Sequence, residues 1–200
     1  MKIGRKITLI LLAIFFIGLS LLLYPSISSY WNSITQSKVV EDYDAMLKSL
    51  TPKDYSDILA AAADYNTRLA ALDFPLMEHT ALTEDYNSAL NVSGDGVMGY
   101  IDIDKIQMKL PIYHGVSDGV LSHAVGHIEG SSLPVGGEST HCVLSAHRGL
   151  PSAKLFTDLD KLEIGDTFRI TVLDRAMIYE VDQIKTVLPT DVGDLLITEG

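Results

Sequence analysis

The chain contains a single cysteine, Cys142, and a histidine, His147, five positions further on. A thiol and an imidazole act together in nucleophilic catalysis only when their side chains lie within hydrogen-bond reach. In a strand through residues 140–147 the odd separation places the two side chains on opposite faces, and five residues span roughly 16 Å. Cys142 would share its face with Leu144 and Ala146. The spacing therefore predicts a buried, structural Cys142 that is not the partner of His147.

His147 is the stronger candidate for chemistry. It ends the predicted strand and is followed by a turn, Arg148-Gly149-Leu150-Pro151. Active-site groups often lie where a rigid strand passes into a loop. A surface histidine without a catalytic role is the alternative that position alone leaves open.

His123 and His127 are the other pair with a possible ligand spacing. Four positions apart on a helix, they would face one side and could bind zinc. However, Gly126 and Gly130 argue against a helix here, and no third ligand follows at a suitable spacing. We therefore predict no metal site.

Two helices are predicted ahead of these residues. Residues 36–50 place apolar side chains at intervals of three and four, as in an amphipathic helix. Thr51-Pro52-Lys53-Asp54 is typical of a second helix start, because Thr51 can cap the helix and Pro52 suits its first turn. This helix should run to about Leu72, where Asp73-Phe74-Pro75 interrupts the pattern.

From residue 92 onward the pattern is that of a mainly β domain. The predicted strands cover residues 97–103, 108–113 and 140–147, and a hairpin pairs 167–173 with 177–188 around Asp174-Arg175. An open sheet that ended at Gly200 would leave a bare edge, which proteins normally close or cover. We therefore expect the domain to be incomplete at Gly200.

The N-terminus predicts a membrane anchor. Residues 7–24 contain no charged side chain, and their 18 residues would extend roughly 27 Å as a helix, enough to cross a hydrocarbon core. Lys2, Arg5 and Lys6 precede them, so residues 1–6 should form a cytoplasmic tail and the rest should lie outside the cell.

A cleaved signal peptide is the alternative to this anchor. Its apolar core is usually shorter, ~7–15 residues, and ends in a small-x-small site. Residues 26–28 offer only a weak site of that kind. Tyr30 and Trp31 lie where an interfacial aromatic belt would be, which favours the anchor.

The part of the chain after the anchor is strongly acidic. It carries all 26 acidic residues but only 12 of the 15 basic ones. Such a surface repels nucleic acid and anionic membrane, and it favours cationic groups, for example lysines of a partner. With one cysteine no internal disulfide can form, so stability must come from the apolar core.

With these segments in view, the chain resembles the sortases, and within them the pilus-assembling class C. The resemblance covers nearly everything from about Val39. It is densest in four segments, LNVSGDGVMGYI (90–101), LPIYHG (110–115), SLPVGG (132–137) and HRGLPSAKLF (147–156), the last continuing through Asp160-Lys161-Leu162.

The resemblance implies a fold and a catalytic histidine. The fold is a sortase-type closed β-barrel, incomplete here, with an N-terminal helical arm and one transmembrane helix. The domains are then a tail (1–6), an anchor (7–24), a helical arm and lid loop (36–91) and a truncated barrel (92–200).

The family histidine, a general acid and base, matches His147. The nucleophilic cysteine belongs to a Thr-Leu-x-Thr-Cys strand expected beyond Gly200, with the oxyanion-binding arginine on the strand after it; Arg148 belongs to the histidine motif.

Class C sortases also carry a lid led by an Asp-Pro-aromatic triplet. Here the matching residues are Asp73-Phe74-Pro75, with the same residue types in a different order. The resemblance therefore implies lid roles for Asp73 and Phe74, and the changed order puts these roles in question.

The implied reaction is transpeptidation without cofactor or calcium. A sortase thiolate cleaves a sorting signal of the Leu-Pro-x-Thr-Gly type, and a pilin lysine resolves the thioester as an isopeptide bond. The partners would be such pilins and the membrane, with no nucleic acid. A non-catalytic pilin-binding protein and a housekeeping sortase that attaches proteins to the cell wall are the alternatives. Since it lacks the nucleophile, this fragment should be inactive alone.

Overall fold

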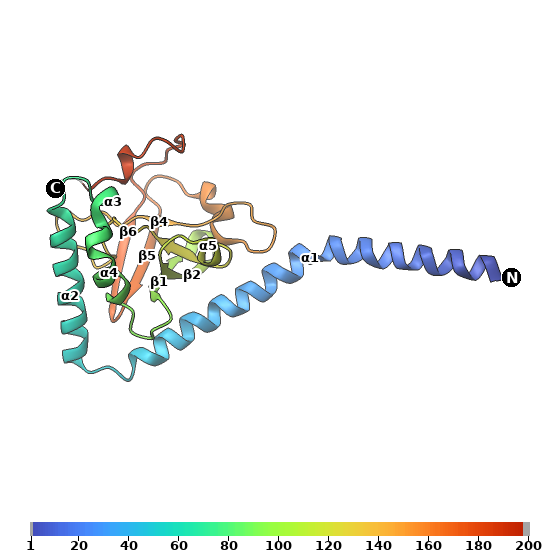
Figure 1. Ribbon diagram of the computed structural model, residues 1–200, viewed down its shortest axis with the longest axis horizontal. Coiled ribbons are helices and arrows are strands. Elements are labelled where there is room, and N and C mark those ends of the chain that lie inside the picture. Colours follow the sequence, from blue (N-terminus) through green and yellow to red (C-terminus); the bar gives the residue numbers. More distant parts are fainter. Residues whose placement is uncertain (1, 198–200) are drawn as a thin grey trace.

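A computed structural model describes residues 2–197 (Figure 1). Its first element, α1 (Lys2–Leu47), is one helix of 46 residues that includes Pro25. The sequence predicted a separate helix over residues 36–50 after the apolar segment 7–24, but the chain stays helical between these two segments. Pro25 lacks only its own N–H, and no glycine follows in residues 26–35, so the helix bends without ending. Figure 1 shows α1 changing direction about half-way along.

Four further helices follow α1 before the sheet begins. The longest, α2 (Pro52–Ala70), starts with the capping box that the sequence predicts: Thr51 accepts from the Asp54 N–H, and the Thr51 N–H donates to the Asp54 carboxylate. The chain continues through α3 (Pro75–Glu78), the 3₁₀ helix η1 (His79–Leu82) and α4 (Thr83–Ser88).

The second half of the chain forms a curled, six-stranded half-barrel. The strands lie in the order β4-β3-β2-β1-β5-β6, and β2 and β3 are the parallel pair. Their bounds are β1 (Val97–Ile103), β2 (Met108–His114), β3 (Val125–His127), β4 (Leu144–Ser145), β5 (Thr167–Val172) and β6 (Arg175–Glu180). The connections contain the short helices η2 (Asp104–Ile106), α5 (Asp118–Leu121), η3 (Leu155–Lys161) and η4 (Gly193–Leu195).

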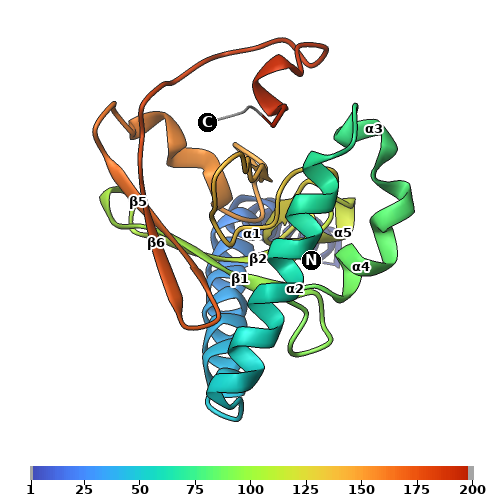
Figure 2. The ribbon, with the colours of Figure 1, turned by 90° about the vertical axis from the view of Figure 1, so that its left-hand side faces the viewer.

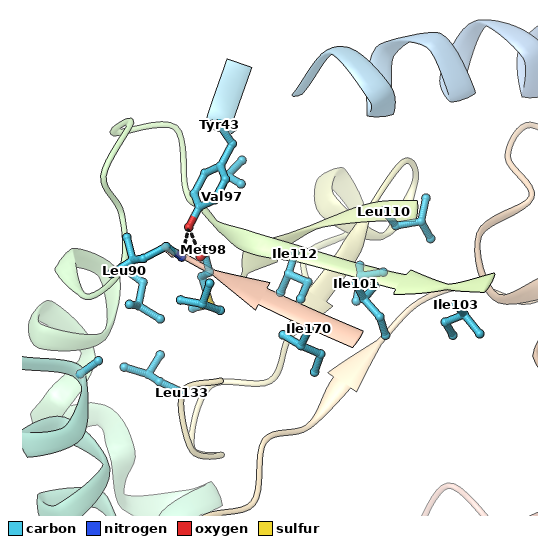
Figure 3. Close-up of a cluster of buried hydrophobic side chains, with 14 of the residues drawn as sticks. Tyr43, Leu90, Val97, Met98, Ile101, Ile103, Leu110, Ile112, Leu133 and Ile170 are labelled. Atoms are coloured by element: carbon cyan, nitrogen blue, oxygen red, sulfur yellow. Dashed lines mark hydrogen bonds between the residues drawn. The ribbon is translucent and has the colours of Figure 1, made fainter. Parts of the chain in front are cut away.

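The core lies between this sheet and the two long helices. Side chains from the sheet, including Met98, Ile101, Ile112 and Ile170, form a continuous buried cluster (Figure 3). The Tyr43 hydroxyl of α1 reaches into this cluster, where it donates to the Met98 carbonyl and accepts from the Leu173 N–H, both at 2.9 Å. Packing is close enough that a Cβ on Gly99 would lie 2.2 Å from the Thr171 carbonyl oxygen of the next strand.

Two predicted strands are shorter than expected. β4 covers two residues instead of 140–147 because its partner β3 has only three, after which Gly130, at φ +89°, turns the chain away. The hairpin is present, but its turn lies at Leu173-Asp174 and its second arm ends at Glu180. Figure 2 shows the residues after β6 crossing above the sheet, and the Leu196 carbonyl lies 2.9 Å from Nδ1 of His141.

Candidate active site

His147 lies at the surface immediately after β4, two residues beyond Ser145. In the antiparallel pairing with β3, Gly126 faces Ser145 and His127 faces Leu144. The same register, continued by two residues, brings His147 opposite Ala124. The imidazole is exposed and therefore accessible to a substrate that lies across this end of the sheet.

Three contacts hold the turn that follows His147. The Phe156 N–H donates to the His147 carbonyl at 3.1 Å, and the Gly149 N–H donates to the Thr157 hydroxyl at 3.1 Å. Arg148 forms an ion pair with Asp160 at 2.7 Å. The backbone of His147 is thus tied to η3, while its side chain is exposed.

Cys142 lies outside any strand, in an extended segment held by the loop after β3. Val143 donates to the Ser131 hydroxyl and its carbonyl accepts from the Ile128 N–H. The residue keeps a small exposed surface, but the thiol is enclosed, and its burial raises the pKa of Cys142 to about 12. A thiol in this state stays protonated at neutral pH, and only the thiolate is a strong nucleophile. The enclosed thiol agrees with the predicted burial, although not through strand alternation; a structural role for Cys142 stays a prediction.

A buried polar network beside Cys142 was not predicted. The imidazole of His127 is fully buried; its Nε2 lies 2.9 Å from the Ser132 carbonyl and its Nδ1 lies 3.1 Å from the Tyr86 hydroxyl. Burial lowers the pKa of His127 to about 4, so the ring is neutral. The Ser132 carbonyl can only accept, so Nε2 carries the proton. The single hydroxyl proton of Tyr86 faces both Nδ1 and the His127 carbonyl, at 3.1 and 3.0 Å. Both ring nitrogens are occupied, which removes His127 from the zinc pair considered with His123.

Comparisons with known proteins agree with this architecture. A family model, the sortase domain, matches residues 101–199. Sortase C1 from Streptococcus agalactiae is 45% identical, covers 82% of this chain and 84% of its own, and superposes with a TM-score of 0.77. The chain belongs to the sortase family. Sortase C from Streptococcus pneumoniae (35% identity, 82% and 83% covered, TM-score 0.70) and sortase C-1 from Actinomyces oris (37%, 74% and 84%, 0.66) are similar as well. No curated protein matches the chain.

The sortase fold predicted from the sequence is thereby confirmed, and the three solved structures named above are class C sortases. His147 occupies an exposed position at the end of β4. Its role in catalysis, and those of Asp73 and Phe74, stay predictions.

Asp73 and Phe74 lie in the connection between α2 and α3 of this sortase. Both are exposed, and Phe74 keeps 62% of its surface accessible. Among residues 2–197 no hydrogen bond, ion pair or ring contact joins either residue to His147. The Phe74 N–H lies 3.4 Å from the Glu78 carboxylate.

The segment after Phe74 is nevertheless attached to the barrel. A Cβ on Gly130 would lie 2.9 Å from both the Leu76 Cα and the Pro75 carbonyl oxygen, so only glycine allows this approach. The Thr83 hydroxyl donates to Glu129 at 2.6 Å, and His79 lies 3.9 Å from the same carboxylate. The loop after β3 therefore holds the whole 75–83 segment in place.

The acidic, histidine and cysteine side chains of residues 2–197 are dispersed. No group of three or more His, Cys, Asp or Glu side chains in this range is arranged to hold an ion. His123 is engaged instead with Ser122 and with the ring of Tyr113, which it meets edge-on at 5.6 Å.

Proposed function

We propose that this sortase chain supplies the catalytic histidine of a transpeptidase that joins pilin subunits. The observation that carries the proposal is the position of His147. Its imidazole is exposed at the end of β4, on a turn tied to η3. The chain around it is 45% identical in sequence to a sortase C1. The substrate class is suggested by a neighbour, the sortase C of Streptococcus pneumoniae, which is described in terms of pilin substrate specificity.

In the proposed reaction a thiolate attacks the Thr–Gly carbonyl of a sorting signal of the Leu-Pro-x-Thr-Gly type. The C–N bond breaks, and the imidazolium of His147 gives its proton to the leaving glycine amine, which leaves a thioester. A pilin lysine then attacks the thioester carbonyl while neutral His147 accepts the proton of the incoming amine. The thiolate departs and an isopeptide bond forms. An arginine side chain would hold the oxyanion in both steps.

The nucleophile in this proposal is a residue other than Cys142. The Cys142 thiol is enclosed and its pKa is raised to about 12, so it offers almost no thiolate. We therefore propose that the 200 residues alone do not turn over a sorting signal.

The proposed location is the cell membrane, with the barrel on the outside. α1 contains a stretch that is long and apolar enough to span a bilayer, and none of that stretch is covered by the rest of the chain. Lys2, Arg5 and Lys6 precede it and favour a cytoplasmic N-terminus.

The coding sequence downstream of Gly200 provides the first test. A Thr-Leu-x-Thr-Cys segment followed by an arginine strand supports the enzyme, whereas a stop codon contradicts it and favours the alternative, a non-catalytic pilin-binding protein. A protein that includes this segment should cleave a fluorogenic Leu-Pro-x-Thr-Gly peptide. His147→Ala should abolish cleavage, and Cys142→Ala should leave the cleavage rate unchanged. His147-dependent turnover by the 200 residues alone would refute the assignment of the nucleophile.

A housekeeping sortase that attaches proteins to the cell wall remains the second enzymatic reading. The segment 75–83, held against the barrel by Gly130 and Glu129, favours the pilus-assembling class. The acceptor amine distinguishes the two enzymes: a pilus-assembling sortase uses a pilin lysine, and a housekeeping sortase uses a cell-wall amine.

A further inference from the structure

One face of α1 is bound to the barrel, and the binding starts close to the apolar segment. The Asn32 side chain donates to the Ser152 carbonyl, and the Gln36 side chain donates to the His123 carbonyl, both at 2.8 Å. Further along the same face, Val40, Tyr43 and Leu47 are buried. Since α1 is continuous from Lys2 to Leu47, with the bend at Pro25 inside it, no loop separates the apolar segment from the barrel, and their relative orientation follows from the course of one helix.

The first contact lies near the level of the lipid headgroups. From Tyr24, the last residue of the apolar segment, to Asn32 the helix rises about 12 Å. The headgroup region on each side of a bilayer is roughly 5–8 Å thick. Tyr30 and Trp31, just before Asn32, keep 67% and 70% of their surfaces exposed, as aromatic residues at a membrane interface do.

The end of the sheet that carries His147 is the end nearest to the apolar segment. Gln36 binds the carbonyl of His123, which precedes β3, and the continued register places His147 opposite Ala124. Asn32 binds Ser152, in the turn that follows His147. In Figure 1 this turn lies beside α1 where the helix leaves the domain.

Two loops form the surface at this end, residues 117–123 and 148–154, which we call the membrane-facing loops. They contain two basic side chains, Arg148 and Lys154, with 63% and 56% of each side chain exposed, and one acidic residue, Asp118. The part of the chain after the anchor has more than twice as many acidic as basic residues. Both basic side chains pair with carboxylates of η3, Arg148 with Asp160 and Lys154 with Asp158, each at 2.7 Å. The charge of this end is therefore closer to neutral than that of the acidic remainder, which reduces its repulsion from lipid phosphates.

We propose that the membrane-facing loops rest on the headgroups of the bilayer that holds residues 7–24, so that His147 faces the membrane. The proposal rests on the anchor proposed above. Its consequence is that polypeptide segments reach His147 along the bilayer surface and not from the side of the barrel that faces away from the membrane.

Depth-dependent fluorescence quenching tests this orientation. The full 200-residue chain, with Cys142→Ala, is placed in phosphatidylcholine vesicles containing phosphatidylglycerol and labelled at one new cysteine. Pro151→Cys reports on the membrane-facing loops. Lys48→Cys, exposed at the other end of the bound helix, is the matched control, and Ile14→Cys reports on the anchor. Circular dichroism checks that each variant is folded.

A headgroup nitroxide lipid should quench the label at Pro151→Cys about threefold more than the label at Lys48→Cys, since the sites differ by ~20 Å in height. Equal quenching, with Ile14→Cys quenched by a nitroxide on the acyl chain, overturns the orientation alone. Absence of quenching at Ile14→Cys overturns the anchor and the orientation together.

An insertion provides a second, independent check. Seven alanines after Ser28 add two helical turns, which preserve the bound face of α1 and lift the barrel by about 10 Å. Quenching at Pro151→Cys should then fall to the level of the Lys48→Cys control. Undiminished quenching would contradict the proposal, because the loops would be reaching lipid by another route.

Discussion

The hydroxyl of Tyr86 lies 3.1 Å from Nδ1 of His127, deep between the α4 helix and the β3 strand. The same hydroxyl accepts from the Gly115 N–H at 2.9 Å. This pair joins the segment before the barrel to the barrel itself. Because protonation would place a charge on this buried imidazole, the junction depends on pH.

We expect His127 to make the protein less stable in acid. Its pKa is about 4 in the folded chain, against 6.5 ordinarily. Below pH 6.5 the unfolded chain binds a proton that the folded chain does not, so the free energy of unfolding should fall as the pH drops from 6.5 to 4. The full loss is about 3 kcal/mol. Denaturation in detergent micelles at pH 7 and pH 4.5 measures it.

His127→Gln is the control for this loss, since its amide can bond Tyr86 and Ser132 without titrating. The variant should lose about 2 kcal/mol less than the parent between the two pH values. Identical losses in both proteins would show that carboxylates alone cause the acid sensitivity.

Tyr43→Phe should weaken the attachment of α1 to the barrel. The substitution leaves the buried Met98 carbonyl and Leu173 N–H without the partner they share, which should lower the free energy of unfolding by about 1–3 kcal/mol. Tyr55→Phe is the matched control, because Tyr55 bonds the Leu47 carbonyl in a partly exposed position. Chemical denaturation of the two variants should separate them; equal stabilities would argue against a special role for Tyr43.

Asp160→Asn should loosen the turn after His147. It removes the ion pair with Arg148, which is exposed on both sides and so contributes only ~0.4–1 kcal/mol. We expect the amide of Gly149 to exchange hydrogen about two- to fivefold faster. Asp57→Asn, which removes the exposed pair with Lys53 on α2, should leave Gly149 unchanged. An unaltered exchange rate in Asp160→Asn would mean that the Thr157 contact alone holds the turn.

Cys142 should react slowly with alkylating reagents. With its pKa raised from 9.0 to about 12, the thiolate fraction at pH 8 falls about a thousandfold. Iodoacetamide should therefore label native Cys142 far more slowly than a cysteine at the exposed position of Pro151→Cys, and denaturant should abolish the difference. Rapid labelling of the native chain would show that Cys142 is activated and reopen its role as a nucleophile.

Several features follow from the sequence because neighbouring residues determine them. The capping box of Thr51 and Asp54 closes over three residues, and the β5–β6 hairpin pairs strands joined by a two-residue turn. The apolar character of segment 7–24 is likewise set by neighbouring residues alone. The motif around His147 identifies the family because it is a contiguous run of residue types.

Other features depend on partners far along the chain, and only the tertiary structure decided them. β4 is short because β3 turns away at Gly130, and Cys142 is enclosed by neighbours that its own segment does not reveal. His127 is neutral because folding buries its ring, beside partners such as Tyr86, 41 residues earlier. The sequence by itself determined that α1 contains an apolar helix and that His147 belongs to a sortase motif. Their relative placement follows from hydrogen bonds that only the folded chain can make, since Asn32 and Ser152 are 120 residues apart.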